Sequence, residues 1–530
     1  MNPLASTKCA GRLLMALAAM TSIFLTVGCG SSGAPAKPNP VGFGLSSLNG
    51  TYVFSSQGLD SNGAPLAVAG AVVANGSGGI TGGTMDVVDA EFTPPSPVAQ
   101  AITSGSYSVG VDGRGRATLN SNNSLGSSIT LDFVLTSSSH GLVTQFDGHG
   151  TGSGTIDLQT AVTSLSQFAG PYAFSLAGSD SGGYPFATAG AFNLNSSGSI
   201  IGGGGVEDFN DNGVVISESL SGVATLGSGT GPGKIPLTTT SFPLTFDFYP
   251  IDATHWKLIE TDYNEFLAGD VFTATQSTVG TMVFTMAGGT STTSVANGGL
   301  MTYNANTVTG SEDVNTDGTV LTQVGFRGTP GATGLIGGRV VVTLSDFVPA
   351  TQWVIYPYSG GLLMLETDSS AVTIGAAFAQ SATSFTASGG YGLNLSGINS
   401  NGPVNYIAQF NASSPTSSPN MSGILDDNEF ATPIENLPLS GTYTPDSVSP
   451  ATGRGLITAP TTGKLGTFLG ALNLEYYVVD SSTVLFIDVD SAQVAVGTFQ
   501  AQGASGSAAA QSRMAIVHPA VRAHGALRRK

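Results

Sequence analysis

Cysteine, tryptophan and charged side chains are scarce in this sequence of 530 residues. It contains two cysteines, two tryptophans, 16 Lys plus Arg and 34 Asp plus Glu, and only 9% of its residues are charged. Both cysteines, Cys9 and Cys29, lie near the N-terminus, which excludes a disulfide framework for the rest of the chain. The first 37 residues hold three of the cations and residues 513–530 hold five, so eight cations face 34 acids in between, a net charge of −26. A surface of this charge repels phosphate backbones, and we expect no nucleic-acid partner.

The longest apolar run lies at the N-terminus. A basic segment precedes an apolar stretch over residues 13–28, which is too short to span a bilayer comfortably and is typical of an export signal. The stretch ends in Gly28-Cys29, which resembles the lipobox of bacterial lipoproteins, where the cysteine sulfur is acylated. The resemblance implies a signal peptide and lipobox over residues 1–29, lipid attachment at Cys29, and an outer-membrane destination because Gly30 rather than Asp follows. An ordinary cleaved signal peptide with an incidental cysteine is the alternative.

The segments beside the two ends have the composition of linkers. Residues 30–45 are rich in Gly, Ser and Pro, which predicts a flexible tether. Residues 503–530 begin with a Gly/Ala/Ser run and hold five cations and no acid, which predicts a disordered basic tail.

The sequence between these linkers contains four copies of one pattern. Each copy opens with a Gly-x-Tyr-x-Phe element, reaches a second glycine eight residues later, continues to a Gly-x-x-Asp element and ends in a strand that starts at a glycine. The opening glycines, separated by 120, 110 and 109 residues, are Gly50, Gly170, Gly280 and Gly389. The second glycines are Gly58, Gly178, Gly288 and Gly397, and the closing ones are Gly154, Gly269, Gly375 and Gly497. The aspartates are Asp86, Asp208, Asp313 and Asp426. We therefore predict repeats at residues 46–160, 161–276, 277–380 and 381–502.

Each repeat has the pattern of short β-strands. In residues 244–248 apolar and polar side chains alternate, the period of a strand with one buried face. Pairs such as Asn212-Gly213 and Asp317-Gly318 suit hairpin turns that need positive φ. The sequence predicts an all-β protein of four tandem antiparallel β units with about eight strands each. Small barrels, which leave no exposed edge, and sandwiches are both consistent with this pattern, and a single propeller with two blades per repeat is a third alternative.

The repeated pattern resembles a family of glycine-rich repeat lipoproteins of soil bacteria whose function is not known. The resemblance rests on the Gly-x-Tyr-x-Phe element, the Gly-Asn/Asp-Gly turn and the Gly-Gly-x-x-Asp element, as in residues 204–208, and covers about residues 46–502. Met282 replaces the opening tyrosine in repeat 3, and Leu393 replaces the phenylalanine in repeat 4. The resemblance implies a fold and gives no reaction, cofactor or ligand.

One metal candidate stands out, the pattern Asp313-x-Asn315-x-Asp317-Gly318. Oxygen ligands at alternate positions before a glycine resemble the first half of a calcium loop. Val324 stands where the bidentate glutamate should be, and the pattern fails in repeats 1 and 4. We therefore favour a hairpin turn and expect no metal or other cofactor.

Catalytic motifs are weak. The pairs Glu260/Asp262 and Glu366/Asp368 each place two acids on one side of a strand, which is one element of a glycosidase site, but solvated sheet faces explain them better. We expect turn or surface positions for the three histidines of the repeats, His140, His149 and His255.

The sequence favours a non-enzymatic, lipid-anchored cell-envelope protein whose β units act as spacers or as weak, multivalent binding modules. Expected partners are the membrane, through the N-terminal lipid, and a surface glycan or envelope protein. The expected location is the outer membrane, facing the periplasm or the cell surface. A polysaccharide-acting hydrolase is one alternative, and a barrel that carries a small apolar ligand is another. Large inward residues such as Phe246, Phe248 and Trp353 favour filled interiors over a carrier.

Overall fold

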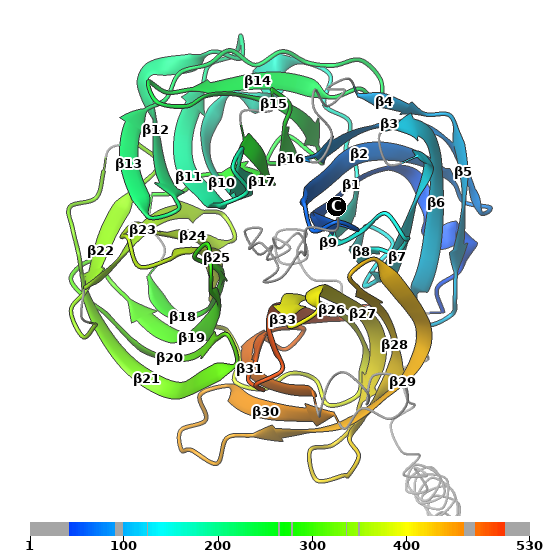
Figure 1. The fold of residues 1–530 in the computed structure, drawn as a ribbon, viewed down its shortest axis with the longest axis vertical. Helices are drawn as coiled ribbons and strands as arrows, with labels where there is room; N and C mark the ends of the chain where they lie inside the picture. Colours follow the sequence, from blue (N-terminus) through cyan, green and yellow to red (C-terminus); the bar gives the residue numbers. More distant parts are fainter. Residues whose placement is uncertain are drawn as a thin grey trace, which may run out of the picture. The chain divides into compact units, whose positions relative to one another are not determined.

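The computed structural model describes residues 42–90, 99–123, 126–262, 265–276, 279–334, 336–347, 350–459 and 472–503. The predicted signal peptide, Cys29, nearly all of the tether and the basic tail lie outside these residues. The described part is all-β apart from two short 3-10 helices, η1 (Leu45–Ser47) and η2 (Leu165–Phe168). Its strands form four antiparallel units, one for each repeat, which confirms the predicted fold class (Figure 1).

The strands follow one another as in a meander. Barrel 1 contains β1 (Asn49–Asp60), β2 (Pro65–Asn75), β3 (Gly79–Asp89), β4 (Gln100–Ile102), β5 (Ser104–Val109), β6 (Arg114–Asn123), β7 (Gly126–Leu135), β8 (His140–Gln145) and β9 (Gly150–Leu158). Barrel 2 contains β10 (Gly170–Asp180), β11 (Pro185–Leu194), β12 (Ile200–Asp211), β13 (Val214–Ser219), β14 (Gly233–Thr238), β15 (Pro243–Pro250), β16 (His255–Glu260) and β17 (Glu265–Thr273). Barrel 3 contains β18 (Gly280–Gly289), β19 (Ser294–Tyr303), β20 (Val308–Thr316), β21 (Thr319–Pro330), β22 (Val340–Leu344), β23 (Thr351–Tyr358), β24 (Gly361–Glu366) and β25 (Val372–Ala379). Barrel 4 contains β26 (Gly389–Asn399), β27 (Gly402–Ala412), β28 (Met421–Glu429), β29 (Thr432–Pro445), β30 (Arg454–Ala459), β31 (Leu472–Asp480), β32 (Thr483–Asp488) and β33 (Gln493–Ala501).

Each unit consists of one curved sheet, so the repeats are barrels and not sandwiches of two sheets. Barrels 3 and 4 are closed, and barrel 1 closes through a pairing of β2 with β3. Barrel 2 is an eight-stranded sheet with β13 and β14 at its edges. Backbone hydrogen bonds join Ser221 to Thr238 and Thr225 to Lys234 across this gap. Pro236 lies between those two bonds in β14 and has no N–H to donate, so the ladder is interrupted there.

The repeated glycines lie where the first and last strands of each barrel meet. A Cβ added at Gly288 in β18 would lie 1.9 Å from the Val372 carbonyl oxygen of β25, and one at Gly375 would lie 2.0 Å from the Thr285 oxygen. The other barrels have the same close approach at their equivalent glycines, for example 1.8 Å from Gly178 to Phe266. Any side chain at these positions would push the two strands apart. The glycine pattern that identified the repeats is therefore a requirement of barrel closure.

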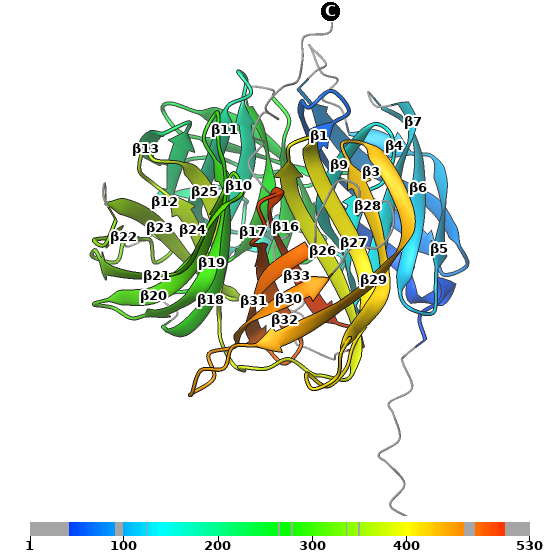
Figure 2. The same cartoon turned by 60° about the horizontal axis from the view of Figure 1, so that its bottom comes forward.

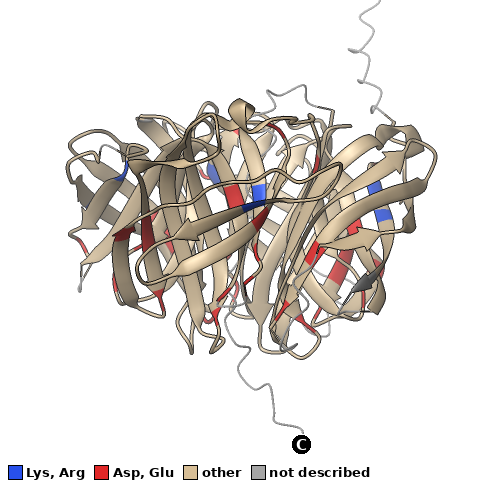
Figure 3. Cartoon of the chain, turned by 90° about the horizontal axis from the view of Figure 1, so that it is seen from above, with Lys and Arg blue, Asp and Glu red and all other residues tan. Residues whose placement is uncertain are grey.

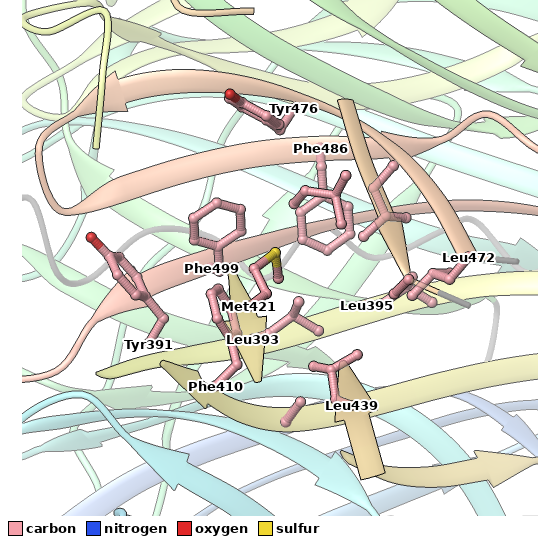
Figure 4. Close-up of a cluster of buried hydrophobic side chains, with 14 of the residues drawn as sticks. Tyr391, Leu393, Leu395, Phe410, Met421, Leu439, Leu472, Tyr476, Phe486 and Phe499 are labelled. Carbon is pink, nitrogen blue, oxygen red and sulfur yellow. The ribbon is translucent and has the colours of Figure 1, made fainter. Parts of the chain in front are cut away.

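Large apolar side chains fill the barrel interiors. In barrel 4 the aromatic residues Tyr391, Phe410, Phe486 and Phe499 meet in one buried cluster (Figure 4). Trp353 occupies the interior of barrel 3, as predicted, and the buried cluster of barrel 2 holds eight aromatic residues besides Trp256. The prediction of filled interiors is confirmed.

Two-residue hairpin turns occur where the sequence predicts them. Asp317 and Gly318 both have positive φ, 47° and 82°, and the pair Asn212-Gly213 has the same conformation. Repeat 4 uses Phe430 and Ala431 at the equivalent turn, with φ of 48° and 57°, although neither residue favours this region. The Phe430 ring packs over Gly402, and a Cβ added at Gly63 of repeat 1 would lie 3.9 Å from it. Local preference therefore does not predict this turn.

Candidate functional site at the junctions between repeats

The aspartate of each Gly-x-x-Asp element is buried at a junction between two repeats. Asp313 of repeat 3 is 1% exposed, and its two carboxylate oxygens accept hydrogen bonds from Nε and Nη2 of Arg454 in repeat 4, both at 2.9 Å. The Tyr477 hydroxyl, also from repeat 4, donates to Asp313 Oδ2 at 2.5 Å. Arg454 further contacts Asp446 and Glu475 of its own repeat. One arginine thus joins a carboxylate of one repeat to two of the next.

The junction between repeats 2 and 3 has the same construction. Arg339 donates from Nε and Nη2 to the two oxygens of Asp208, each at 2.6 Å, and the Tyr356 hydroxyl donates to Asp208 Oδ2. Bidentate pairs of this kind fix orientation as well as distance.

The junction between repeats 1 and 2 keeps the tyrosine without the arginine. The Tyr249 hydroxyl donates to Asp86 Oδ2 at 2.6 Å, while Lys234 pairs with Asp247 of its own repeat at 2.6 Å. Burial, together with the negative charge of Asp247, raises the pKa of Asp86 to about 7.

A fourth junction joins repeat 4 back to repeat 1. Arg114 of β6 contacts both oxygens of Asp426, at 2.6 and 2.8 Å, although 312 positions separate them in the chain. The cross-strand neighbour of Arg454 is Tyr477, whereas the cross-strand neighbour of Arg114 is Val134. This junction therefore has the arginine without the tyrosine. Strands β26 and β27 lie beside β7, β8 and β9 of barrel 1 (Figure 2). The four junctions therefore form a closed cycle.

A recurring asparagine adds a second contact at three junctions. The Asn315 side-chain amide donates to the backbone oxygens of Asp488, Asp490 and Gln493 in repeat 4, at 2.9 to 3.2 Å. Asn210 binds the equivalent loop of repeat 3, and Asn428 donates to two carbonyls of repeat 1. In repeat 1 the equivalent residue is Val88, which packs in an apolar cluster with repeat 2. Each asparagine satisfies backbone acceptors that burial would otherwise leave unpaired.

These contacts engage each residue of the calcium candidate. Asp313 binds Arg454 and Tyr477, Asn315 binds the carbonyls of repeat 4, and Asp317 Oδ1 accepts the Ser294 backbone N–H at 2.8 Å. A cation at Asp313 would have to displace a guanidinium that holds both carboxylate oxygens. Within the described residues, no group of three or more His, Cys, Asp or Glu side chains could hold a metal ion. The donor set does not fit calcium, and the hairpin turn accounts for the pattern.

The scarcity of cations makes their positions informative (Figure 3). Of the seven Lys and Arg in the described residues, six form ion pairs with carboxylates; the exception, Arg327, is exposed. In every repeat one of them follows a glycine: Gly113-Arg114, Gly233-Lys234, Gly338-Arg339 and Gly453-Arg454. Our repeat pattern did not include this Gly-Arg/Lys element, although its recurrence in so uncharged a chain is a detectable signal.

A second ionic cluster is buried between repeats 1 and 2. His140 Nδ1 lies 2.7 Å from Asp157, and both Lys257 Nζ and His255 Nε2 lie 2.7 Å from Asp270. All five side chains are less than a tenth exposed, so the expectation of surface positions was wrong for His140 and His255. The two histidines occupy equivalent places, as the first residues of β8 and β16.

The charges of this cluster act across the junction. Burial alone would raise the pKa of Asp157, but His140, with Lys257 and His255 of repeat 2, holds it below its ordinary value. Burial likewise opposes ionisation of Asp270, and Lys257 and His255 hold its pKa down. Both carboxyls are therefore ionised in the folded protein.

The other repeats are uncharged at the places that Lys257 and Asp270 occupy. Lys257 pairs across strands with Asp270, and the equivalent pairs are Leu363 with Ala376, Leu142 with Thr155 and Leu485 with Thr498. The same fold therefore forms with an uncharged pair of residues at these two positions.

Carboxyl groups also lie inside the barrels. Glu366 follows Leu362 and Met364 on the inward face of β24, and its oxygens accept hydrogen bonds from Ser370 and Thr373 at 2.6 Å. Glu366 is 7% and Glu260 0% exposed, so the expectation of solvated sheet faces for these acids was wrong. A carboxylate that shares a closed interior with other acids and no cation tends to bind a proton.

The pKa values follow from this burial. Burial raises the pKa of Glu312 to about 7, and Asn297 donates to its Oε2 at 2.9 Å. Burial, with the nearby charges of Asp368 and Glu312, also raises the pKa of Glu366 to about 7. In barrel 2 burial raises the pKa of Glu207 to about 8. These acids keep a proton in the folded protein at a pH where the unfolded chain has lost it.

Comparisons with known proteins find only weakly similar solved structures. No protein-family model and no curated protein matches the sequence. Among solved structures, a transferrin binding protein B mutant from Haemophilus parasuis is similar at 10% identity and a TM-score of 0.19, covering 68% of this chain and 83% of that one. Kievitone hydratase from Nectria haematococca is similar at 10% identity and a TM-score of 0.17, covering 64% of this chain and 93% of that one. Scores this low support no inference about the present protein.

The junction arginines are expected to stabilise the fold strongly. Replacing Arg454 by methionine leaves Asp313 buried without its cation, and we expect the free energy of unfolding to fall by about 3–5 kcal/mol. Urea denaturation followed by tryptophan fluorescence measures this change. The matched control is Arg327→Met on the exposed side of β21, expected to change stability by less than about 0.5 kcal/mol. Equal effects of the two substitutions would contradict the assigned role.

The Lys257 cluster allows a test by partial replacement. Lys257→Leu leaves Asp157 and Asp270 without their amine and is expected to cost about 3–5 kcal/mol of unfolding free energy. The double variant Lys257→Leu/Asp270→Ala copies the pair found in repeat 3 and should recover most of that loss. Thermal and urea denaturation of both variants measure the effect. A double variant as unstable as the single one would show that the cluster is not a replaceable ion pair.

The interior acids make stability depend on pH. The pKa of Glu312 is raised in the folded state, so its contribution is complete below the unfolded value of 4.5 and is lost as the pH rises to about 7. Glu312→Gln cannot ionise, and relative to the wild type it should gain about 3 kcal/mol between pH 4.5 and pH 8. Denaturation at the two pH values measures this difference. The control is the exposed Asp346→Asn, for which we expect no such gain.

Proposed function

We propose that the protein is a non-enzymatic, lipid-anchored component of the cell envelope, in which four β-barrels form one rigid platform for spacing or for binding a glycan or an envelope partner. The observation that carries the proposal is that the aspartates of the repeated Gly-x-x-Asp element bind residues of other repeats. Asp208, Asp313 and Asp426 each bind an arginine of another repeat, and so they join the barrels to one another.

This use of the motif favours a platform over a string of independent modules. Independent modules gain avidity by repeating one free site along a flexible chain. Here the residues that the repeats share are buried between them, and apolar clusters join the same neighbours, as Ala287 and Ala296 of repeat 3 do with Val494 of repeat 4. Interfaces with buried apolar contacts restrict motion between domains.

The interior acids give the hydrolase alternative little support. Glu312 and Glu366 are held by Asn297, Ser370 and Thr373 of their own repeat, at one end of an interior filled by large apolar side chains. Filled interiors equally disfavour the carriage of a small apolar ligand.

Attachment through lipid at Cys29 is the remaining part of the proposal. Among the residues that the structure describes, no helix is long and apolar enough to cross a membrane. An acylated Cys29 followed by the tether would connect the platform to a bilayer from one side.

Protease shaving of intact cells tests the location. Proteinase K is added to whole cells, and an immunoblot against residues 46–502 follows the protein body, with a periplasmic protein as the leakage control. Loss of the body while the control survives supports display at the surface. Protection of both places the platform on the periplasmic side and argues against a role in adhesion.

The two cysteines supply a matched pair of variants for the anchor. Cys29→Ser should lose incorporation of an alkyne-labelled fatty acid and leave the membrane fraction, because the acylated sulfur is gone. Cys9→Ser should behave as wild type, since Cys9 lies within the predicted signal peptide. Full labelling of the Cys29→Ser protein would contradict the anchor.

A further inference from the structure

A pocket of about 190 Å³ lies between barrels 3 and 4. Four chain segments surround it: those joining β18 to β19, β20 to β21, β26 to β27 and β32 to β33. Its lining residues come from repeats 3 and 4, so it belongs to the junction between these two repeats. Its volume equals the share of roughly six water molecules in the liquid and is below the range of drug-sized ligand sites.

The lining of the pocket combines hydroxyl groups, the side-chain amides of Asn399 and Gln493, one carboxylate and a few apolar side chains. Thr292, Ser400 and Ser491 are exposed around its mouth, and Val494 is buried beneath them. The Asp317 carboxylate is fixed beside them, because the Ser294 N–H donates to its Oδ1 at 2.8 Å. Among the described residues that line the pocket there is no Lys, Arg or His.

We propose that this pocket binds one uncharged sugar ring, either free or at the end of a glycan. Sugar hydroxyls both donate and accept, which matches the serine and threonine hydroxyls and gives donors to the Asp317 carboxylate. Ile398 and Ala492, both half-buried, offer apolar surface to the C–H face of the ring. An acidic sugar or a phosphate would meet Asp317 with no cation to compensate, so the site selects against anions. This inference rests on the proposed function, whose glycan partner it makes specific.

Saturation-transfer NMR with the full chain in detergent tests the proposal. The probes are D-glucose, N-acetylglucosamine and glucuronate, each titrated separately. At least one of the neutral sugars is expected to bind with a millimolar Kd, and glucuronate at least tenfold more weakly. Absence of binding by both neutral sugars, or equal binding of glucuronate, overturns the proposal with the wild-type protein alone.

Two variants locate the binding. Asp317→Asn keeps the turn, because asparagine accepts positive φ and retains the acceptor for Ser294, but it removes the charge and should weaken binding about tenfold. Ser491→Phe should block the pocket and abolish binding. Asn212→Asp, at the equivalent turn of repeat 2, is the matched control and should leave the Kd unchanged.

The variants also separate this inference from the proposed function. Sugar binding that survives both Asp317→Asn and Ser491→Phe overturns the pocket assignment. That result would leave the outcome of cell shaving untouched, so the failure of one is distinguishable from the failure of the other.

Discussion

The arrangement of the four barrels depends on one contact, a buried aspartate held by an arginine or a tyrosine of another repeat. A carboxylate as buried as Asp313 needs a cation or several donors, because ionised groups lose several kcal/mol of solvation in a protein interior. Arg454 and Tyr477 supply both, and they can do so only if barrel 4 packs against barrel 3 in one orientation. The contact thus fixes the relative orientation of neighbours, while the apolar clusters around it supply most of the favourable burial.

The low charge content of the chain strengthens this constraint. With few cations in the repeats, a misplaced carboxylate finds no substitute partner, and the alternatives are to take up a proton or to stay in water. Pairing with a cation, uptake of a proton and exposure to water each occur at particular acids. Asp313 is paired, Glu312 beside it in sequence turns inward with a pKa of about 7, and Asp317 caps a turn at the surface. Adjacent strand residues point to opposite sides, so one step in the sequence separates a junction contact from a barrel interior.

The sequence predicted the fold class because barrel closure acts through local features. The glycines at 58, 178, 288 and 397 recur since the first and last strands approach too closely for a Cβ, and the alternation in residues 244–248 shows which face is buried. The junctions were not predicted. Whether Asp313 faces a cation or solvent depends on Arg454, 141 positions away, and the recurrence of the two elements does not show which aspartate meets which arginine. The sequence does not show the burial of Glu260 and Glu366 for a related reason: alternation distinguishes the two faces of a strand, and a polar residue normally marks the outer face, whereas these two acids are buried.

Repeats 4 and 1 are neighbours in the cycle although they are not consecutive in the chain. The Arg114–Asp426 contact spans 312 positions against 141 for Arg454–Asp313, and each doubling of loop length adds about 0.6 kcal/mol of closure entropy, so the last junction costs little more than the others. It accordingly has a small apolar cluster, Val134 and Leu142 with Ile407, and depends on amide and hydroxyl contacts such as Asn405 with Ser153 and Thr151. Polar contacts of this kind specify geometry more than they drive association. A junction that closes a row of four barrels needs mainly that specificity, because the other three junctions already hold repeats 1 and 4 in one assembly.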